Sequence, residues 1–266
     1  MLVWSKKGHV AVMVVAAFLI GVFYVLPLAV IGAASVAGEW NDLLPIKITL
    51  QHYVNVFQGD LREQVWVSLI TGVLASAGAL FVGAWGALAM RAFGQQNQNR
   101  LNLLFFVPSA VPSVSVGLGL LVAFSRPPLL LNGTTAIVLI AHFIMVFAFT
   151  YGNVSAGLKS ISPDIEQVAQ SLGATPAYCL RNVTLPLIVP QMAAAFSLSF
   201  ALSMGELGAT VMVYPPGWMT MPVGIFSLSD RGEIFDGSAL SIILILATLL
   251  ALTAVAFVTK GHKTGK

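Results

Sequence analysis

A single acidic residue, Glu206, lies inside a long apolar run of the chain and is the first candidate for chemistry. An ionisable group at membrane depth is costly unless it is paired or faces water, so such a residue is functional by default. Gly205 and Gly208 flank it, and they permit a close approach of helices or a locally broken helix that lines a path. Three roles remain open: contact with an ammonium group of a substrate, a gate that rearranges, or a structural hydrogen-bond anchor.

A second polar cluster interrupts another apolar run, near residue 110. Pro108 and Pro112 each remove a backbone donor, which kinks a helix. The hydroxyl groups of Ser113 and Ser115 follow them in the chain and are candidates for lining a polar path. The alternative is a purely structural kink.

The sequence contains no catalytic or metal-binding pattern. It has no H-E-x-x-H or G-x-S-x-G run, and one intramembrane carboxylate cannot form an acid pair, which argues against an intramembrane enzyme. His142 has no second His, Asp or Glu nearby in sequence, so we predict a hydrogen-bonded packing residue. We expect no catalytic residue and no metal site.

The polar segment 155–184 carries start and stop signals for two short helices. Ser162-Pro163 suits the start of the first helix, and acidic residues in its first turn complement the helix dipole. Gly173 suits its end, and Thr175-Pro176 signals a second start. Leu185-Pro186 then begins the next apolar segment. We predict a pair of helices that docks against a partner.

This segment resembles the EAA loop of permease subunits of bacterial ABC importers, through the runs 166–169, 171–176 and 183–186. In that family the loop forms a coupling helix, which seats in a groove of the ATPase subunit and transmits ATP-driven closure to the spans. The family's Glu-Ala-Ala falls here on residues 167–169, so a role that needs a carboxylate at position 167 is weakened. The residues that the resemblance assigns to coupling are Glu166, Gln167, Val168, Ala169, Gly173 and Ala174.

Further runs extend the resemblance along nearly the whole chain. Residues 108–119 and 203–210 are similar to permeases of the importer group for sulfate, molybdate, polyamines and iron. Residues 214–218 and 226–232 are most similar to permeases for 2-aminoethylphosphonate. The resemblance implies import of that phosphonate by alternating access, with the other small solutes as alternatives. A similar Gly-Glu-x-Gly-Ala run in relatives that carry inorganic anions favours a gate or an anchor at position 206. The pathway or gate residues that we expect are Glu206, Gly205, Gly208, Ser113 and Ser115.

The resemblance also implies partners. The sequence has no G-x-x-x-x-G-K-[ST] phosphate loop, so we expect no cofactor in this chain, with ATP and Mg bound by a separate ATP-binding subunit. A periplasmic substrate-binding protein would deliver the substrate, and a second permease subunit, identical or homologous, would complete the path. An ion-coupled secondary transporter is a rival, but it has no use for an ATPase-docking loop.

The composition determines which elements must position these residues. Hydrophobic residues make up 58% of the 266 residues and charged residues 9%, against about 25% charged in globular proteins. A spanning helix needs about 20 apolar residues. We predict an all-α, polytopic membrane protein of about six spans with the type I ABC importer permease fold, as one permease domain over residues 1–266 that includes the coupling loop 155–184. The expected spans are 10–36, 65–90, 101–124, 135–154, 185–213 and 239–258.

Charge placement predicts the orientation of these spans. With six spans, nine Lys and Arg residues fall on the side of the termini and four on the opposite side. The positive-inside rule then places both termini in the cytoplasm and the chain in the bacterial inner membrane. The first apolar run is longer than the core of a signal peptide, so we predict an uncleaved first span. The expected surroundings are the lipid bilayer and protein partners, without nucleic acid.

Overall fold

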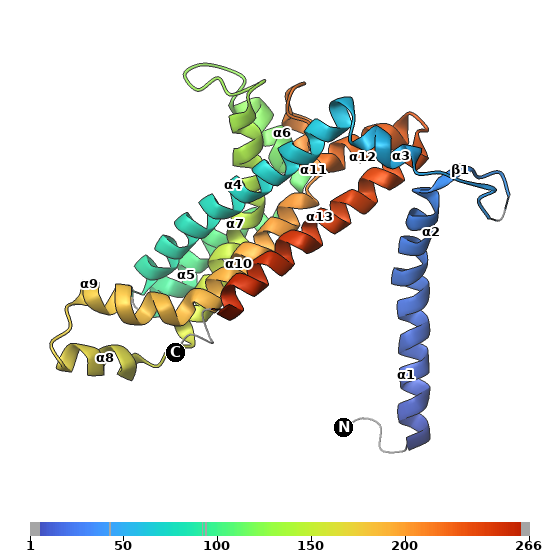
Figure 1. Cartoon of the computed structure of the whole chain (residues 1–266). Helices are drawn as coiled ribbons and strands as arrows, with labels where there is room; N and C mark the ends of the chain where they lie inside the picture. Colours follow the sequence, from blue (N-terminus) through green and yellow to red (C-terminus); the bar gives the residue numbers. More distant parts are fainter. Residues whose placement is uncertain (1–5, 43, 92, 94, 262–266) are drawn as a thin grey trace. The chain divides into compact units, whose positions relative to one another are not determined.

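The computed structural model describes residues 6–42, 44–91, 93 and 95–261, and its regular structure is almost entirely helical (Figure 1). The two chain ends, whose cytoplasmic location the sequence predicts, lie outside the described residues. The α-helices in chain order are α1 (Lys6–Ile20), α2 (Leu26–Ala34), α3 (Gln51–Val56), α4 (Gly59–Met90), α5 (Gln95–Phe106), α6 (Ser113–Ala123), α7 (Thr135–Lys159), α8 (Pro163–Ser171), α9 (Pro176–Cys179), α10 (Leu185–Met204), α11 (Gly208–Val213), α12 (Met221–Asp230) and α13 (Ile234–Gly261). The other elements are the π-helical turns Gly21–Val25 and Leu180–Thr184, the 3-10 turn Val107–Ala110, and the strands β1 (Ala37–Glu39) and β2 (Lys47–Ile48).

The described residues contain five helical stretches that are long and apolar enough to cross a membrane. A bent pair of helices makes a sixth if the two are counted as one span. These stretches confirm the prediction of an all-α protein with about six spans, because each predicted apolar run coincides with one of them.

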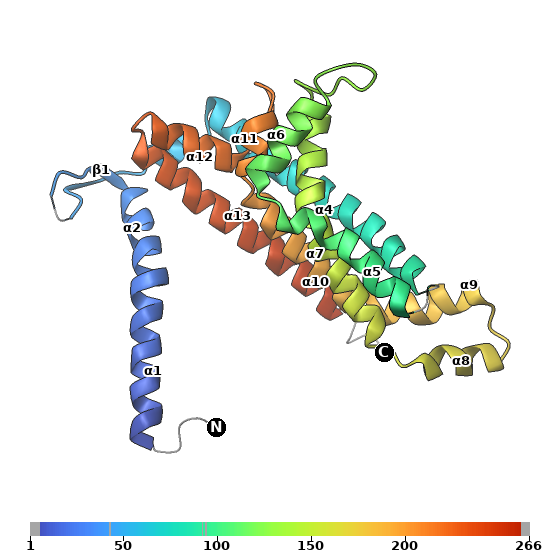
Figure 2. The ribbon, with the colours of Figure 1, turned by 180° about the vertical axis from the view of Figure 1, so that it is seen from behind.

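The bent pair is the predicted third span, and its break is sharper than a kink. Segments Arg100–Ala110 and Ser113–Ala123 meet at 95°, and Figure 2 shows α5 and α6 running in different directions from this corner. Val111 is extended, as expected for the residue before a proline, and Pro112 stands just before α6. The two prolines therefore divide this span into two helices.

The segment before the fifth span differs from the prediction at Leu185-Pro186. No new helix begins there, because the helix runs from Pro176 to Met204 as one 29-residue stretch. The π-helical turn Leu180–Thr184 precedes Pro186, whose ring lacks an N–H and clashes with the carbonyl of an ordinary α-turn. A local π-turn therefore lets the coupling segment continue into the span.

The chain forms two compact units, one of residues 63–223 and 244–266 and the other of residues 1–62 and 224–243. The core of the larger unit lies where α4, α7 and α10 pack side by side (Figure 1). Tyr151 of α7 is buried there among small residues of α4 and against Ile188 of α10. A second apolar cluster joins α6, α7 and α11.

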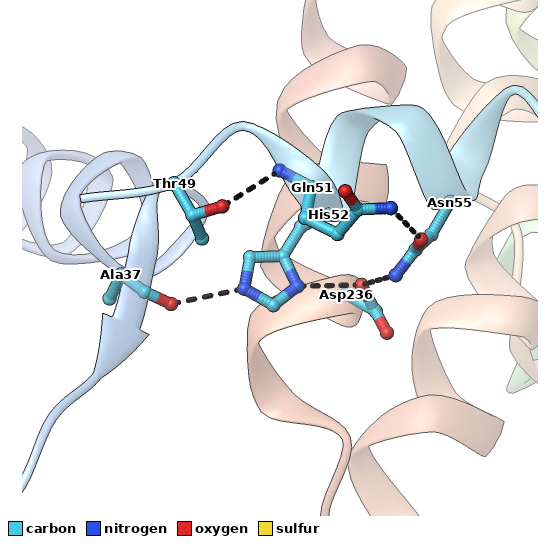
Figure 3. Close-up of polar contacts among 6 residues, drawn as sticks. All are labelled: Ala37, Thr49, Gln51, His52, Asn55 and Asp236. Carbon is cyan, nitrogen blue, oxygen red and sulfur yellow. Dashed lines mark hydrogen bonds and ion pairs between the residues drawn. The ribbon is translucent and has the colours of Figure 1, made fainter. Parts of the chain in front are cut away.

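In the smaller unit, a short antiparallel hairpin and α3 fill the connection between α2 and α4. His52 of α3 contacts Asp236 at the start of α13, with 2.7 Å between Nδ1 and Oδ1, and its Nε2 donates to the carbonyl oxygen of Ala37 at 3.0 Å (Figure 3). The amide of Asn55 donates to the same carboxylate oxygen at 3.1 Å. These contacts fasten the hairpin, α3 and the start of α13 to one another.

Candidate functional site

The fifth apolar run is a broken helix, as one of the two alternatives for its glycines predicts. Helix α10 ends at Met204, residues 205–207 are not helical, and α11 begins at Gly208. Glu206 lies in this break and is half-buried. Its Oε1 accepts a hydrogen bond from the backbone N–H of Ala209 at 2.8 Å. The carboxylate therefore satisfies a donor at the start of α11 that a broken helix leaves without an intrahelical partner.

Helix α11 crosses α6 at unusually short range, and glycines make the crossing possible. A Cβ on Gly208 would overlap Ser113 Oγ, and a Cβ on Gly117 of α6 would stand 2.6 Å from the carbonyl oxygen of Ala209. The structure thus brings Gly208 and Ser113 together, and their role in a pathway or gate remains a prediction. Ser115 is exposed on α6, and Gly205 is exposed at the end of α10.

These contacts bear on the three alternatives for Glu206. One of its oxygens is engaged by the backbone of α11, which is what a structural anchor does. A gate and a substrate contact remain predictions.

Two substitutions of Glu206 should separate the anchor from a role of the charge. Glu206→Gln keeps an acceptor for the Ala209 N–H, whereas Glu206→Ala leaves that donor unpaired at a cost of about 1–3 kcal/mol. We expect the alanine variant to be markedly worse in uptake and in the thermal stability of the purified protein. Equal and complete loss of uptake in both variants, with normal assembly, would instead assign the function to the charge.

The second candidate site is the segment 155–184, in which the predicted first helix forms as α8 at one end of the larger unit (Figures 1 and 2). The Ser162 hydroxyl accepts from the Asp164 N–H at 3.4 Å, as its choice as a cap predicts. Gly173 has φ +91°, and the N–H of Ala174 reaches the carbonyl of Ala169 at 3.0 Å. This is the Schellman end of a helix, which favours glycine because L side chains are strained at positive φ.

Glu166 ties α8 to two other elements, which the sequence did not reveal. Its two carboxylate oxygens accept from the guanidinium of Arg91 at 2.8 and 2.9 Å, and Oε1 also accepts from the Thr184 hydroxyl at 2.6 Å. Arg91 follows α4, and Thr184 closes the π-turn that leads into α10. Hydrogen bonding to Arg91 holds the pKa of the Glu166 carboxyl below its usual range, so the pair is charged near neutral pH.

Another face of α8 is apolar and exposed. Ile165, Val168 and Leu172 recur at helical spacing and are 44%, 59% and 84% exposed. Gln167 is also exposed, whereas Ala169 is partly covered. Helix α8 is therefore held to the larger unit through Glu166 and presents an apolar face away from that attachment.

A set of buried polar contacts surrounds the broken helix and is not predictable from the sequence. His142 is 1% exposed and hydrogen-bonded on both nitrogens, which confirms the prediction of a hydrogen-bonded packing residue but adds partners that it did not name. The Trp218 indole N–H donates to Thr71 Oγ1 at 3.0 Å, and the Met221 N–H to Ser68 Oγ at 2.7 Å, which fastens the segment after α11 to α4. Only the polar residues on one face of an otherwise apolar α4 hinted at this in the sequence.

Comparisons with known proteins place this architecture among transport proteins. The family described as "Binding-protein-dependent transport system inner membrane component" matches residues 79–261. The chain is 57% identical over 250 residues to the putative 2-aminoethylphosphonate transport system permease protein PhnV of Salmonella typhimurium, covering 94% of each chain. It is 26% identical over 218 residues to the spermidine/putrescine transport system permease protein PotC of Escherichia coli K12, covering 82% of each.

A solved structure shows the same fold. A chain of a bacterial ABC transporter involved in the import of the acidic polysaccharide alginate matches with a TM-score of 0.78 at 17% identity, over 96% of this chain and 95% of that one. A chain of the methionine ABC transporter MetNI, in an inward-facing conformation, matches with a TM-score of 0.60 over 76% of this chain. The type I importer permease fold predicted from the sequence is thereby confirmed.

Proposed function

We propose, from the premise that the chain belongs to the family of inner membrane components of binding-protein-dependent transport systems, that it is the permease subunit of an ATP-driven importer of 2-aminoethylphosphonate. The observation that supports this choice of substrate is the 57% identity, over 94% of both chains, to a permease named for that compound. The similarity to a polyamine permease is 26% and supports the importer family more than any substrate.

The proposed mechanism assigns distinct tasks to this chain and its partners. A periplasmic binding protein delivers the substrate, this chain and a second permease subunit enclose the path, and ATP-binding subunits hold ATP and Mg and drive alternating access. A zwitterionic phosphonate is too polar to cross a hydrocarbon core unaided, so it needs such a path. Both termini lie in the cytoplasm in this proposal, as the charge count predicts.

The exposed face of α8 is the proposed docking surface for the ATPase. Its apolar residues Ile165, Val168 and Leu172 are all exposed to a large extent, and Leu172 most of all. Glu166 is hydrogen-bonded to Arg91, which follows α4, and to Thr184, which precedes α10, so a movement of α8 would be transmitted directly to both helices. The proposed gate is the broken fifth span, with Glu206, Gly205 and Gly208, next to Ser113 and Ser115 of α6.

Growth on a single phosphorus source tests the substrate. Deleting the gene should abolish growth on 2-aminoethylphosphonate while growth on phosphate is unchanged, and a plasmid copy should restore it, because no other path carries the phosphonate in a strain without further uptake systems. Uptake of labelled phosphonate by the same cells checks that the defect is in entry. A mutant that still grows on the phosphonate but loses sulfate, molybdate, polyamine or iron uptake would contradict the substrate and leave the permease assignment intact.

A further inference from the structure

One imidazole joins the two halves of the broken fifth span. His142 Nδ1 lies 2.7 Å from the hydroxyl of Ser203, in the last turn of α10, and Nε2 lies 2.8 Å from the hydroxyl of Thr210, in α11. Residues 205–207 separate these two helices in the chain. The side chain is 1% exposed, and its partners Ser203 and Thr210 are 3% and 0% exposed. All three groups therefore form a closed polar contact that spans the break.

The donors and acceptors in this contact follow from the number of protons that its three groups carry. The backbone carbonyl of Glu206 lies 3.3 Å from the Thr210 hydroxyl and can only accept, so we assign the hydroxyl proton to that contact. With this assignment the hydroxyl oxygen accepts from His142 Nε2–H. A charged imidazolium in this apolar interior would be uncompensated, so the ring is neutral and Nδ1 accepts from the Ser203 hydroxyl. The assigned chain of donors runs from Ser203 through His142 and Thr210 to the carbonyl of Glu206.

The short helix α11 needs such outside support. It has six residues, which is too few to be stable alone, so tertiary contacts must set its position. Its contact with α6 is van der Waals packing at Gly117, whereas its contact with His142 is directional. The same bond chain ends on Glu206, whose carboxylate starts α11.

We propose that His142 is a positioning residue of the transport cycle, which locks α11 to α10 across the break in the state seen here and must release one of its two partners when the gate moves. The role of this contact in a gate rests on the proposed function, whereas the contact between α10 and α11 through His142 rests on the geometry alone. A release of this kind needs no titration, because exchanging one hydroxyl partner for water or another hydroxyl is sufficient.

The chain provides a matched control for this lock. Thr150, also on α7, hydrogen-bonds the Ser199 hydroxyl of α10 at 2.6 Å and is likewise fully buried. That contact joins α7 to α10 without reaching α11. Thr150→Val therefore removes a buried bond of the same kind and leaves the break bridged.

The test measures the distance across the break in the full chain, in lipid nanodiscs. Spin labels on Leu202 of α10 and Met212 of α11, in a Cys179→Ser background, should give one narrow distance distribution. His142→Ala and Thr210→Val should each broaden it or add a second population, and the double variant should be no broader than His142→Ala. His142→Gln, whose amide N–H reaches toward Thr210, should restore much of the narrow distribution, and Thr150→Val should leave it unchanged.

Uptake of 2-aminoethylphosphonate by the assembled transporter is the second readout. We expect His142→Ala and Thr210→Val to lower the maximal rate by about three- to tenfold, the range of one intramembrane hydrogen bond, with little change in the substrate concentration for half-maximal uptake. A distance distribution that His142→Ala does not alter, or that Thr150→Val broadens equally, would overturn the lock. If the wild-type transporter does not carry the phosphonate, the proposed substrate fails, and the distances still decide this inference.

Discussion

Replacing Gly117 by valine should prevent the chain from reaching its folded state, whereas the same helix should tolerate alanine at Gly119. A Cβ on Gly117 would stand 2.6 Å from the carbonyl oxygen and 2.8 Å from the Cα of Ala209, which are both backbone atoms. Backbone cannot rotate away as a side chain can, so α6 and α11 must separate. Overpacking of this kind costs about 1–3 kcal/mol or more, and the cost is larger for valine than for alanine because the valine side chain is larger. A Cβ on Gly119 would meet no described atom within 4 Å, so this position serves as the control.

The measurement is the yield of monodisperse protein in detergent and its thermal midpoint, with membrane insertion checked separately. Gly117→Ala should give a lower midpoint, Gly117→Val little folded protein, and Gly119→Ala a wild-type midpoint. The apolar cluster of Leu120, Ile137 and Val213 would lose its packing when the crossing opens. Wild-type stability and uptake in Gly117→Val would show that α6 and α11 do not cross here.

The second large effect is expected at Glu166, where alanine should abolish most uptake while insertion and assembly remain normal. The carboxylate is the attachment of α8 to Arg91 and Thr184, through three hydrogen bonds of 2.6 to 2.9 Å. A hydrogen bond to a charged group is worth about 1.5–3 kcal/mol, and about 1.4 kcal/mol corresponds to a factor of ten. We therefore expect uptake to be at least about tenfold lower, because a detached α8 no longer transmits its movement to α4 and α10.

Two variants control this prediction. Asp164→Asn changes an exposed acid on the same helix that bonds to Ser162 and should leave uptake near the wild-type rate. Exchanging the charges in Arg91→Glu with Glu166→Arg should restore part of the activity lost in either single variant. If Glu166→Ala transports normally, or if the exchanged pair is as poor as the single variants, the ion pair is not the attachment that couples α8 to the spans.

The pH dependence of the same contact has a defined sign. The pKa of the Glu166 carboxyl is lowered in the folded protein, chiefly by its hydrogen bonds to Arg91. Its stabilising contribution is therefore present above the unfolded-state pKa and is lost only as pH falls through the lower folded-state pKa. Mild acidification of the cytoplasm, the side on which the proposed function places α8, should not reproduce the Glu166→Ala defect.

Local signals in the sequence determined much of this protein. Runs of about 20 apolar residues determine which segments span the membrane as helices, because a backbone in lipid must satisfy its own hydrogen bonds. Ser162 and Gly173 determined both ends of α8, since a cap and a positive φ depend on neighbouring residues alone. The resemblance supplied the family and the hypothesis of a docking role, neither of which can be read from hydrophobic periodicity. The break at Gly205 and the corner at Pro112 are predictable from the sequence because Gly and Pro act on their own backbone.

Contacts between distant residues were decided only by the tertiary structure. Arg91 and Glu166 are 75 positions apart, and His142 is 61 positions from Ser203 and 68 from Thr210. In the sequence Glu166 looked like a helix-dipole residue and His142 like packing, because neither has a partner at helical spacing. Which hydroxyl meets an imidazole, and which glycine meets a carbonyl, depends on how α4, α6, α7, α10 and α11 pack. Apolar patterning sets the length and existence of such helices but leaves their rotation and crossing to side-chain packing, which has no one-dimensional signature.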